Sequence, residues 1–294
     1  GSGISMSNAS PTITNCYING DNNPGFVGVS HSSNGIVLNG STGTSSAIIR
    51  NNVIIAFNAC SPSCGTFFAV NVQTGATIAN NIIAGGNAAG ANIIVGVLVS
   101  GSDNFVVENN TILGGSVSSS SAHGIYINNY SGNLKIQNNI IFNQRNDGTS
   151  GFGYCINEAT STSSPSLVQN NNLFGCQYLY RDNGGAGNVA NLATALTSPS
   201  GTLQSMGNVS IDNTGGQLFA DINGADGSIS TLTDNDWRLT QNAAICNIRG
   251  GGLNLSPSIT TDKDGLNRTI SAIAGCTPGN IGAANWSIGA YEKD

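Results

Sequence analysis

Apolar and polar residues alternate in a short motif that recurs along the first two thirds of the chain. It has the form x-φ-x-Asn-Asn-x-φ, where φ is apolar, and its clearest copy is TIANNII at residues 77–83. The other copies are residues 12–18 (TITNCYI), 48–54 (IIRNNVI), 106–112 (VVENNTI), 135–141 (KIQNNII), 167–173 (LVQNNNL) and, more faintly, 205–211 (SMGNVSI). The central copies return every 29 residues. A period of this length indicates a solenoid or another repeat array.

The apolar positions of the motif lie five residues apart, which fits neither a helix nor a straight strand. We predict two short strands joined by a bend at the Asn pair, with the apolar residue of each strand facing inward. Asn suits a bend because it tolerates left-handed backbone angles. Stacked copies predict a ladder in which each buried amide bonds to the coils above and below. The predicted ladder residues are Asn15, Asn51, Asn80, Asn109, Asn138 and Asn170.

A second apolar strand precedes each motif, for example at residues 35–38, 95–99 and 124–127. Each coil therefore contains at least two strands joined by turns of small residues. We predict one continuous domain with three parts. Residues 1–178 form regular coils, residues 179–235 form irregular final coils with one short helix near 188–197, and residues 236–294 form a C-terminal tail packed on the solenoid.

Composition narrows the class of protein. The 294 residues include 40 Gly, and only 8% are charged, which is typical of a turn-rich β protein. The net charge of −6, with nine scattered Lys and Arg residues, argues against a nucleic-acid partner. There is no apolar run of the length that crosses a bilayer, so we predict no membrane span.

Seven cysteines are too many to ignore in this chain, and no Cys-x-x-Cys pair with matching His indicates zinc. We predict disulfides instead, and these place the protein outside a reducing cytosol, in the extracellular space or on the cell surface. The candidate pairs are Cys60 with Cys64, Cys155 with Cys176, and Cys246 with Cys276. Cys16 takes the place of the second Asn in the first copy, and we expect it to be a buried, unpaired small residue.

The repeats and the tail together resemble known families. The Asn-bend coils resemble the pectate-lyase-like superfamily of right-handed parallel β-helices. Four pieces of the tail, LFAD at 218–221, DWRL at 236–239, DKDGLNR at 262–268 and IGAYE at 288–292, resemble bacterial surface proteins of the choice-of-anchor Q type. The resemblance implies an all-β, right-handed parallel β-helix with an Asn ladder and an irregular C-terminal cap region. It implies no particular activity, because lyases, hydrolases and adhesins share this fold.

The tail departs from the family pattern at two positions. Cys246 stands where such tails carry Asp, and Ser287 replaces the Asp before Ile-Gly-Ala. A Cys246–Cys276 disulfide would take the place of a polar interaction at position 246.

Charged and aromatic residues of the fifth and sixth coils form the candidate ligand site. Carboxylates beside tyrosine rings suit sugar binding, because hydroxyls bond to the carboxylates and sugar rings stack on the aromatic faces. The alternative is a solvated, salt-bridged loop edge. The candidates are Arg145, Asp147, Tyr154, Glu158, Tyr178, Tyr180, Arg181 and Asp182. His123, at a strand start, is expected to be a turn or surface residue rather than a catalytic base.

Two Asp-Gly stretches are similar to calcium loops, because alternating oxygen ligands and a Gly turn suit Ca²⁺. Their candidate ligands are Asp221 and Asp226 in one stretch and Asp262 and Asp264 in the other. Neither has the full loop spacing or the terminal Glu, so turns stabilised by Asp–backbone hydrogen bonds are the stronger interpretation. We predict no other cofactor.

These observations favour a non-catalytic, extracellular or cell-surface protein that mediates adhesion or binds a polysaccharide or a cell-surface glycan. A polysaccharide lyase or glycoside hydrolase is the alternative, although carboxylates and bases are sparse in the coils. A third interpretation is structural. The coil that starts at Gly1 has no obvious cap, and an exposed strand end invites end-to-end self-association.

Overall fold

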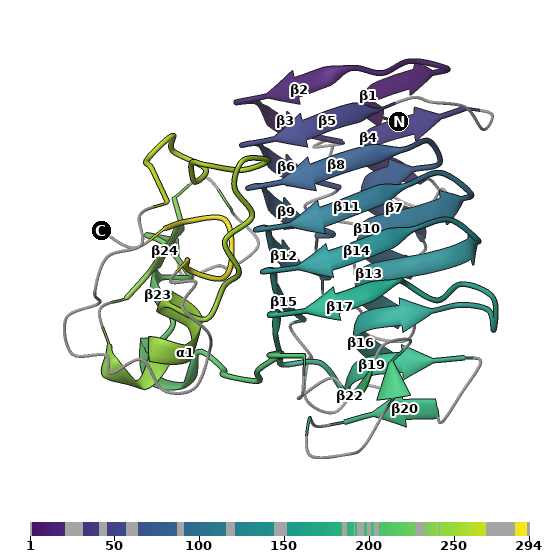
Figure 1. Ribbon diagram of the computed structural model, residues 1–294. Coiled ribbons are helices and arrows are strands. Elements are labelled where there is room, and N and C mark those ends of the chain that lie inside the picture. The colour runs from purple at the N-terminus through teal and green to yellow at the C-terminus, as the bar shows by residue number, and fades with distance from the viewer. Residues whose placement is uncertain are drawn as a thin grey trace.

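The computed structural model describes residues 2–20, 32–40, 46–56, 64–86, 91–115, 121–143, 152–183, 187–190, 192, 197–198, 201–202, 206–226, 232, 234–240, 242–268 and 286–292. Within these residues, three parallel sheets run along the length of a solenoid, and a C-terminal layer lies against one side of it (Figure 1). The all-β solenoid predicted from the repeat is confirmed.

The three sheets take one strand each from successive coils. Sheet A contains β1 (Ser2–Ser7), β4 (Ser33–Asn39), β7 (Cys64–Val72), β10 (Ala91–Gly101), β13 (Ser121–Tyr130), β16 (Phe152–Glu158), β19 (Tyr178–Asp182) and β20 (Gly187–Val189). Sheet B contains β2 (Thr12–Thr14), β5 (Ala47–Arg50), β8 (Ala76–Ala79), β11 (Phe105–Glu108), β14 (Leu134–Gln137) and β17 (Leu167–Gln169). Sheet C contains β3 (Tyr17–Asn19), β6 (Val53–Ile55), β9 (Ile82–Ala84), β12 (Thr111–Leu113), β15 (Ile140–Phe142) and β18 (Asn172–Phe174).

The repeat places equivalent residues side by side. Thr77 pairs with Val106, and Val106 pairs with Lys135 on the following strand. The pairing between successive coils is parallel throughout the three sheets, and only the final pair, β19 with β20, is antiparallel. Each outward-facing position of the motif therefore becomes a row of side chains along the solenoid axis.

The Asn pair forms the bend between sheets B and C, but its two residues have different roles. The first Asn of each copy adopts the left-handed conformation, with φ between 52° and 60° from Asn15 to Asn170. Its side chain is not part of the ladder. The prediction that the ladder consists of Asn15, Asn51, Asn80, Asn109, Asn138 and Asn170 is therefore wrong by one position.

The ladder runs through the second Asn of each pair. Asn81 Nδ2 donates to Asn110 Oδ1 at 3.0 Å, and Asn110 Nδ2 donates to Asn139 Oδ1 at 3.0 Å. The full row is Asn52, Asn81, Asn110, Asn139, Asn171 and Asn208, each linked to the next. Gly207, with φ of 74°, occupies the left-handed position before Asn208. The bend sends the first side chain outward and the second into the coil, where the neighbouring ladder amides and backbone carbonyl oxygens such as that of Ile78 satisfy it.

Apolar residues on both sides of the bend fill the solenoid. Ile78 and Ile83 of the clearest copy are fully buried in the same cluster, as the motif predicts. In sheet A, the glycines Gly96 and Gly124 lie side by side on adjacent strands. A Cβ added to Gly124 would lie 2.3 Å from Ile141 Cγ2 and 2.6 Å from the carbonyl oxygen of Cys155, so this position has no room for a side chain.

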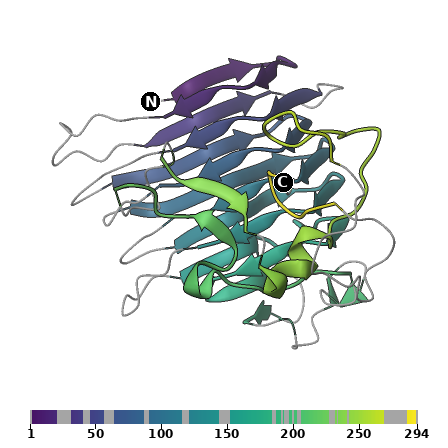
Figure 2. The ribbon, with the colours of Figure 1, turned by 90° about the vertical axis from the view of Figure 1, so that its left-hand side faces the viewer.

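The C-terminal layer covers the outer face of sheet C. It contains η1 (Thr214–Gly216), β23 (Phe219–Asp221), β24 (Asp236–Leu239), η2 (Ala243–Ile245) and α1 (Cys246–Arg249), while β21 (Thr197–Ser198) and β22 (Gly201–Thr202) precede it. Phe142 and Phe174 of sheet C pack with Phe219 and Trp237 of the layer in one apolar cluster. Figure 2 shows this layer in front of the stacked strands. Because Phe219 belongs to it, the layer begins upstream of the predicted boundary at residue 236.

Arg268 fastens this layer to the solenoid. Its buried guanidinium donates from Nη2 to Asn80 Oδ1 at 3.0 Å and from Nη1 to Glu292 Oε2 at 3.4 Å. The Asp262 carboxylate accepts from the backbone N–H of Glu292 at 3.1 Å. The first Asn of other coils contributes as well, since Asn138 exchanges two bonds with the Leu253 backbone, each of 2.8 Å. The first asparagines of successive coils therefore form an outward row that holds the tail by hydrogen bonds.

One predicted disulfide is confirmed, between Cys155 and Cys176, with Cα atoms 5.6 Å apart. Cys246 is disulfide-bonded, while its predicted partner Cys276 and the side chains of Cys60 and Cys64 lie outside the described residues. Cys16 is a free thiol, but it is exposed rather than buried, because no described coil covers it on the side of β1.

The predicted helix near 188–197 is wrong where the structure describes it, since residues 187–189 form β20. The α-helix of the described chain is instead α1, a single turn in the tail. None of the described helices is long and apolar enough to cross a membrane.

Candidate functional site

The predicted charge cluster separates into two parts. Tyr154 and Tyr178 lie in an outward row of sheet A, with ring centroids 5.5 Å apart, and the Arg181 guanidinium lies 5.7 Å from the centre of the Tyr154 ring. These three residues do come together. Arg145 and Asp147 lie outside the described residues.

Both faces of the Tyr154 ring are already covered. Tyr178 stacks on one side of it, and the His123 ring lies 5.2 Å from it, tilted by only 8°. Tyr126 stacks on the other side of His123 at 4.7 Å. A sugar ring therefore has no free face of Tyr154 to stack on, and this column is a weaker sugar platform than the sequence predicts.

His123 is a packed residue of this column and not a surface residue. It is 2% exposed, and burial, followed by repulsion from Arg181, lowers its pKa to about 3. The imidazole is therefore neutral at ordinary pH. Its ring nitrogens are 3.0 Å from Ser121 Oγ and 3.2 Å from Asn157 Nδ2, so both have hydrogen-bond partners.

Glu158 and Tyr180 lie inside the last coils and not on the predicted edge. Tyr180 is fully buried beside Ile156, and its hydroxyl donates to Glu158 Oε1. Burial raises the pKa of Glu158 to about 7, against the opposing effect of the Tyr180 hydrogen bond. Asp182 interacts with the same carboxyl and raises its pKa further. These polar groups satisfy one another near the end of the core.

Both calcium candidates are Asx turns. Asp262 Oδ1 accepts from the backbone N–H groups of Asp264 and Leu266, each at 2.9 Å. Asp221 Oδ1 accepts from Asn223 at 3.2 Å and from Gly224 at 3.0 Å. Asp226 donates its own backbone N–H to Asp234. Across the described residues, no group of three or more His, Cys, Asp and Glu gathers to hold a metal.

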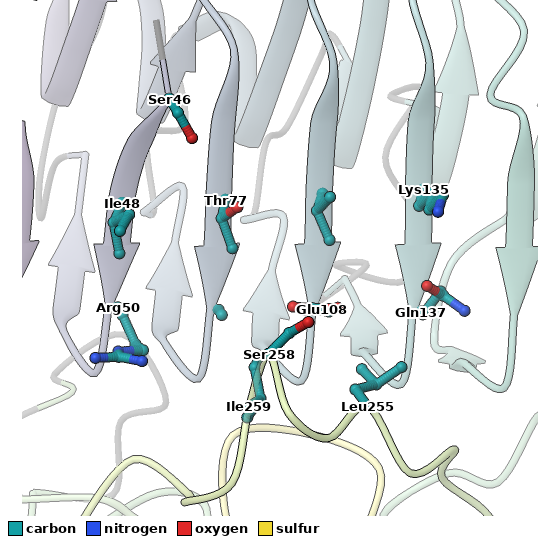
Figure 3. Close-up of a pocket in the computed structure, with 12 residues that line it drawn as sticks. Ser46, Ile48, Arg50, Thr77, Glu108, Lys135, Gln137, Leu255, Ser258 and Ile259 are labelled. Carbon is teal, nitrogen blue, oxygen red and sulfur yellow. The ribbon is translucent and has the colours of Figure 1, made fainter. Parts of the chain in front are cut away.

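A cleft of about 410 Å³ lies between the outer face of sheet B and the tail segment at residues 255–259. We call it the tail cleft (Figure 3). Two rows of sheet B side chains line it. The first row contains Ile48, Thr77, Val106 and Lys135, and the second contains Arg50, Ala79, Glu108 and Gln137. The tail contributes Leu255, Ser258 and Ile259.

The two rows give the tail cleft an apolar floor and a polar wall. Ile48 is 36% exposed, and Thr77 and Val106 are partly exposed, so aliphatic groups face the open space. Ile259 and Trp286 pack against Ala79 in one buried cluster, so the tail covers the second row at Ala79. The polar ends of Arg50, Glu108 and Gln137 are left along that wall (Figure 3).

Glu108 is the most unusual residue of this wall. It is 5% exposed, yet within the described chain no hydrogen-bond donor or ion-pair partner reaches its carboxyl group. Burial raises the pKa of Glu108 to about 7, although the charges of Lys135 and Arg268 oppose the rise. The carboxyl is largely withdrawn from water, which is costly, while its oxygens stay open to the cleft. A ligand that donates a hydrogen bond would satisfy it.

The sequence did not reveal the tail cleft, because its two sides lie far apart in the chain. The signals available were the charged residues at outward positions of the motif, Arg50, Glu108 and Lys135, in IIRNN, VVENN and KIQNN. Repeat register brings these three residues together on one face, in two adjacent rows. Nothing in the repeat indicates that the segment around Ser258 returns to cover that face.

Comparisons with protein-family models, with curated proteins and with solved structures found no match to this chain. The fold is a parallel β-solenoid on the evidence of the structure itself. Function must therefore be argued from the site.

Proposed function

We propose that the protein is a non-catalytic, extracellular or cell-surface β-helix of the pectate-lyase-like type that binds carbohydrate in the tail cleft. The observation that carries this proposal is the Glu108 carboxyl, nearly buried and unpartnered among the described residues, at the wall of a cleft with an aliphatic floor. A sugar presents hydroxyl donors at its rim and C–H groups on its ring faces. Hydroxyls match Glu108, and the ring faces match Ile48 and Val106.

The size and lining of the cleft support the same conclusion. Ligand sites commonly enclose about 300–1,000 Å³ and combine apolar walls with a few placed polar groups. Gln137, Thr77 and Ser258 add amide and hydroxyl groups that suit hydroxyl recognition. The Cys155–Cys176 disulfide supports a location outside a reducing cytosol. The likeness of the tail to choice-of-anchor Q proteins supports a bacterial cell surface.

A glycan array read with two variants tests the proposal. Ile48→Trp fills the tail cleft from a position that is 36% exposed and leaves the core untouched. Leu266→Trp adds the same ring at a 52% exposed site outside the cleft. We expect Ile48→Trp to abolish glycan binding and Leu266→Trp to retain it. Equal binding by both variants, or no binding by the unmodified protein, would refute the proposal.

Glu108 also gives the enzyme alternative one specific observation in its favour. A carboxyl with its pKa near 7 suits a general acid or base. Glycoside hydrolysis ordinarily uses two carboxyl groups, however, and Glu108 is the one acidic residue among those that line the cleft. Assays for reducing ends and for unsaturated products, on any glycan that the array identifies, decide between binding and catalysis.

A further inference from the structure

The outward row of first asparagines binds the backbone of the tail. Asn170 Nδ2 donates to the carbonyl oxygen of Gly251 at 2.6 Å, and Asn80 Nδ2 donates to that of Thr261 at 2.7 Å. Asn138, between them, bonds to the tail backbone in the same way. In these three coils the amides contact peptide groups and not particular side chains. The row therefore suits a neighbouring chain of varied sequence.

Two further members of the row lie beyond the tail. Asn51 and Asn15 directly follow the paired residues Arg50 and Thr14, so they stand one and two coils past Asn80. Both have the left-handed backbone of the row, with φ of 60° and 56°. Neither side chain makes a hydrogen bond within the described chain. Asn51 Oδ1 is buried, but Asn51 Nδ2 is open to solvent and Asn15 is exposed, so a partner can reach both amides.

These two asparagines line a second cleft, of about 680 Å³, which we call the N-terminal cleft. Its solenoid wall contains Asn15, Cys16, Tyr17, Asn51 and Val53, and its tail wall contains Lys263, Asp264 and Gly265. The Tyr17 side chain is 51% exposed, and Leu266, which follows the tail wall, is 52% exposed. Two of the three large hydrophobic side chains exposed in the described chain therefore flank this cleft. Exposed apolar groups rimmed by polar ones mark interaction sites.

The charges of the N-terminal cleft cancel. Lys263 Nζ lies 3.6 Å from Asp264 Oδ1, and it lies 5.7 Å from the centre of the Tyr291 ring. No other charged residue is among those that line the cleft. A neutral lining favours an uncharged ligand that has its own donors and acceptors, and a peptide backbone is such a ligand.

We propose that the N-terminal cleft holds an extended segment of a partner protein, whose backbone continues along the outward row where the tail leaves it. The amides of Asn51 and Asn15 donate to its carbonyl oxygens, and an apolar side chain of the segment packs on Tyr17. The new interface is continuous with the one that the tail already forms with the solenoid. It is separate from the tail cleft and does not depend on carbohydrate binding.

The spacing of the coils sets the length of the segment. Neighbouring strands are about 4.8 Å apart, so Asn15 lies ~10 Å from Asn80 along the row. An extended chain rises about 3.3 Å per residue, so about three residues cover this distance. The side chains of these residues give the partner its specificity, while the backbone bonds are common to any sequence.

A library of random twelve-residue peptides displayed on phage tests the proposal. The library is selected on the unmodified protein, and each enriched peptide is synthesised and titrated by calorimetry. We expect peptides whose binding weakens about tenfold in the Asn15→Gly/Asn51→Gly variant, because two hydrogen bonds to the peptide are lost. Glycine adopts the left-handed backbone of both positions, so the fold is retained. Asn129→Gly is the matched control, because Asn129 is an exposed asparagine with φ of 49° outside the cleft.

Two further measurements distinguish recognition of the backbone from recognition of side chains. Tyr17→Ser should weaken binding about tenfold, because the exposed ring is the apolar contact of the segment. In the peptide, each backbone amide is replaced in turn by an ester, whose carbonyl is a weaker acceptor. We expect a loss at one or two positions, and we expect that loss to vanish in the Asn15→Gly/Asn51→Gly variant. Thermal melting of each variant verifies that it is folded.

Each outcome decides a separate part of the proposal. No enriched peptide, or peptides that bind the Asn15→Gly/Asn51→Gly variant as tightly as the unmodified protein, would overturn it. Ester losses of the same size in both proteins would overturn the role of the two amides. Displacement of the peptide by a glycan that the array identifies would assign the cleft to carbohydrate instead. Ile48→Trp fills the tail cleft and not the N-terminal cleft, so it should leave peptide binding unchanged whatever its effect on glycans.

Discussion

Arg268 donates from Nη2 to the side-chain oxygen of Asn80, a residue 188 positions earlier, at 3.0 Å. This bond links the Asn bend after β8 to the C-terminal tail. The same guanidinium donates to the carbonyl oxygens of Gly289 and Ala290 and forms an ion pair with Glu292, whose side chain is 3% exposed. One arginine therefore joins three segments of the protein.

Replacing Arg268 with Met should strongly destabilise the tail. The change leaves Glu292 buried without its cation, and breaking one side of a buried pair costs about 3–5 kcal/mol. Urea unfolding, followed through the fluorescence of Trp237 and Trp286, measures the loss. The double variant Arg268→Met/Glu292→Met should recover much of it, because it removes the uncompensated charge. A double variant as unstable as the single one would show that the charge pair is not the cause.

The fold could be predicted from the sequence because each coil repeats the same local choice. The inward positions of Ile78 and Ile83 follow from the spacing of the motif alone. The two residues of each Asn pair look equivalent in the sequence. The pair therefore does not show whether its first or its second Asn forms the ladder. The motif alignment at 205–211 puts Asn208 at the first Asn position, but the structure places Gly207 there and Asn208 in the ladder. Glycine replaces a residue with left-handed backbone more readily than it replaces a ladder amide.

The candidate site could be predicted only in part, for a different physical reason. Tyr154 and Tyr178 occupy the same position of successive coils, and Arg181 lies three residues after Tyr178 on β19, so the register brings the three side chains together. The tail cleft requires the irregular segment around Ser258 to return to sheet B. No period fixes that return. It depends on individual bonds such as those of Asn138 with Leu253.

The Asn ladder predicts opposite consequences for two adjacent residues. Asn110→Ala removes amide bonds to Asn139 Oδ1 and to the carbonyl oxygen of Ile78, and it leaves Asn81 without its acceptor. We expect a loss of about 3 kcal/mol or more, because several buried groups become unsatisfied. Asn109→Gly should change stability by less than about 1 kcal/mol, since glycine adopts the φ of 54° without strain.

Chemical denaturation of the Asn110→Ala and Asn109→Gly proteins provides the comparison. Asn109 is a matched control, because neither amide atom of its buried side chain has a hydrogen-bond partner in the described chain. Equal losses for the two variants would contradict the assignment of the ladder to the second Asn of each pair.

The close packing around Gly124 in β13 predicts that a single added methyl group is not tolerated there. Its Cβ would clash with Ile141 and with the backbone of Cys155, and overpacking a well-filled core costs about 1–3 kcal/mol or more. Gly153→Ala is the control on the neighbouring strand, because its nearest contact would be an ordinary 3.6 Å. We expect a clear fall in the melting temperature for Gly124→Ala and almost none for Gly153→Ala. Similar melting temperatures would show that the core around Gly124 adjusts to the added methyl group.

Glu108 predicts a pH-dependent stability difference between the unmodified protein and the Glu108→Gln variant. Below pH 4.5 the carboxyl is protonated in both the folded and the unfolded chain, so its burial adds no ionisation cost. As the pH rises from 4.5 to about 7, the unfolded chain releases the proton first, and folding loses stability. The loss is complete above about pH 7. It amounts to at most about 3 kcal/mol, since each unit of pKa shift corresponds to about 1.4 kcal/mol, and the raised pKa already includes the opposing charges of Lys135 and Arg268.

The Glu108→Gln variant lacks this cost, so its stability should match that of the unmodified protein near pH 4.5 and exceed it increasingly toward pH 8. Glu158 has a pKa raised to about 7 as well, but it is present in both proteins and cancels from the difference. Urea unfolding of both proteins across this range measures the difference directly. A constant difference would show that the pKa of Glu108 does not change on folding and that solvent or a partner already satisfies its charged form.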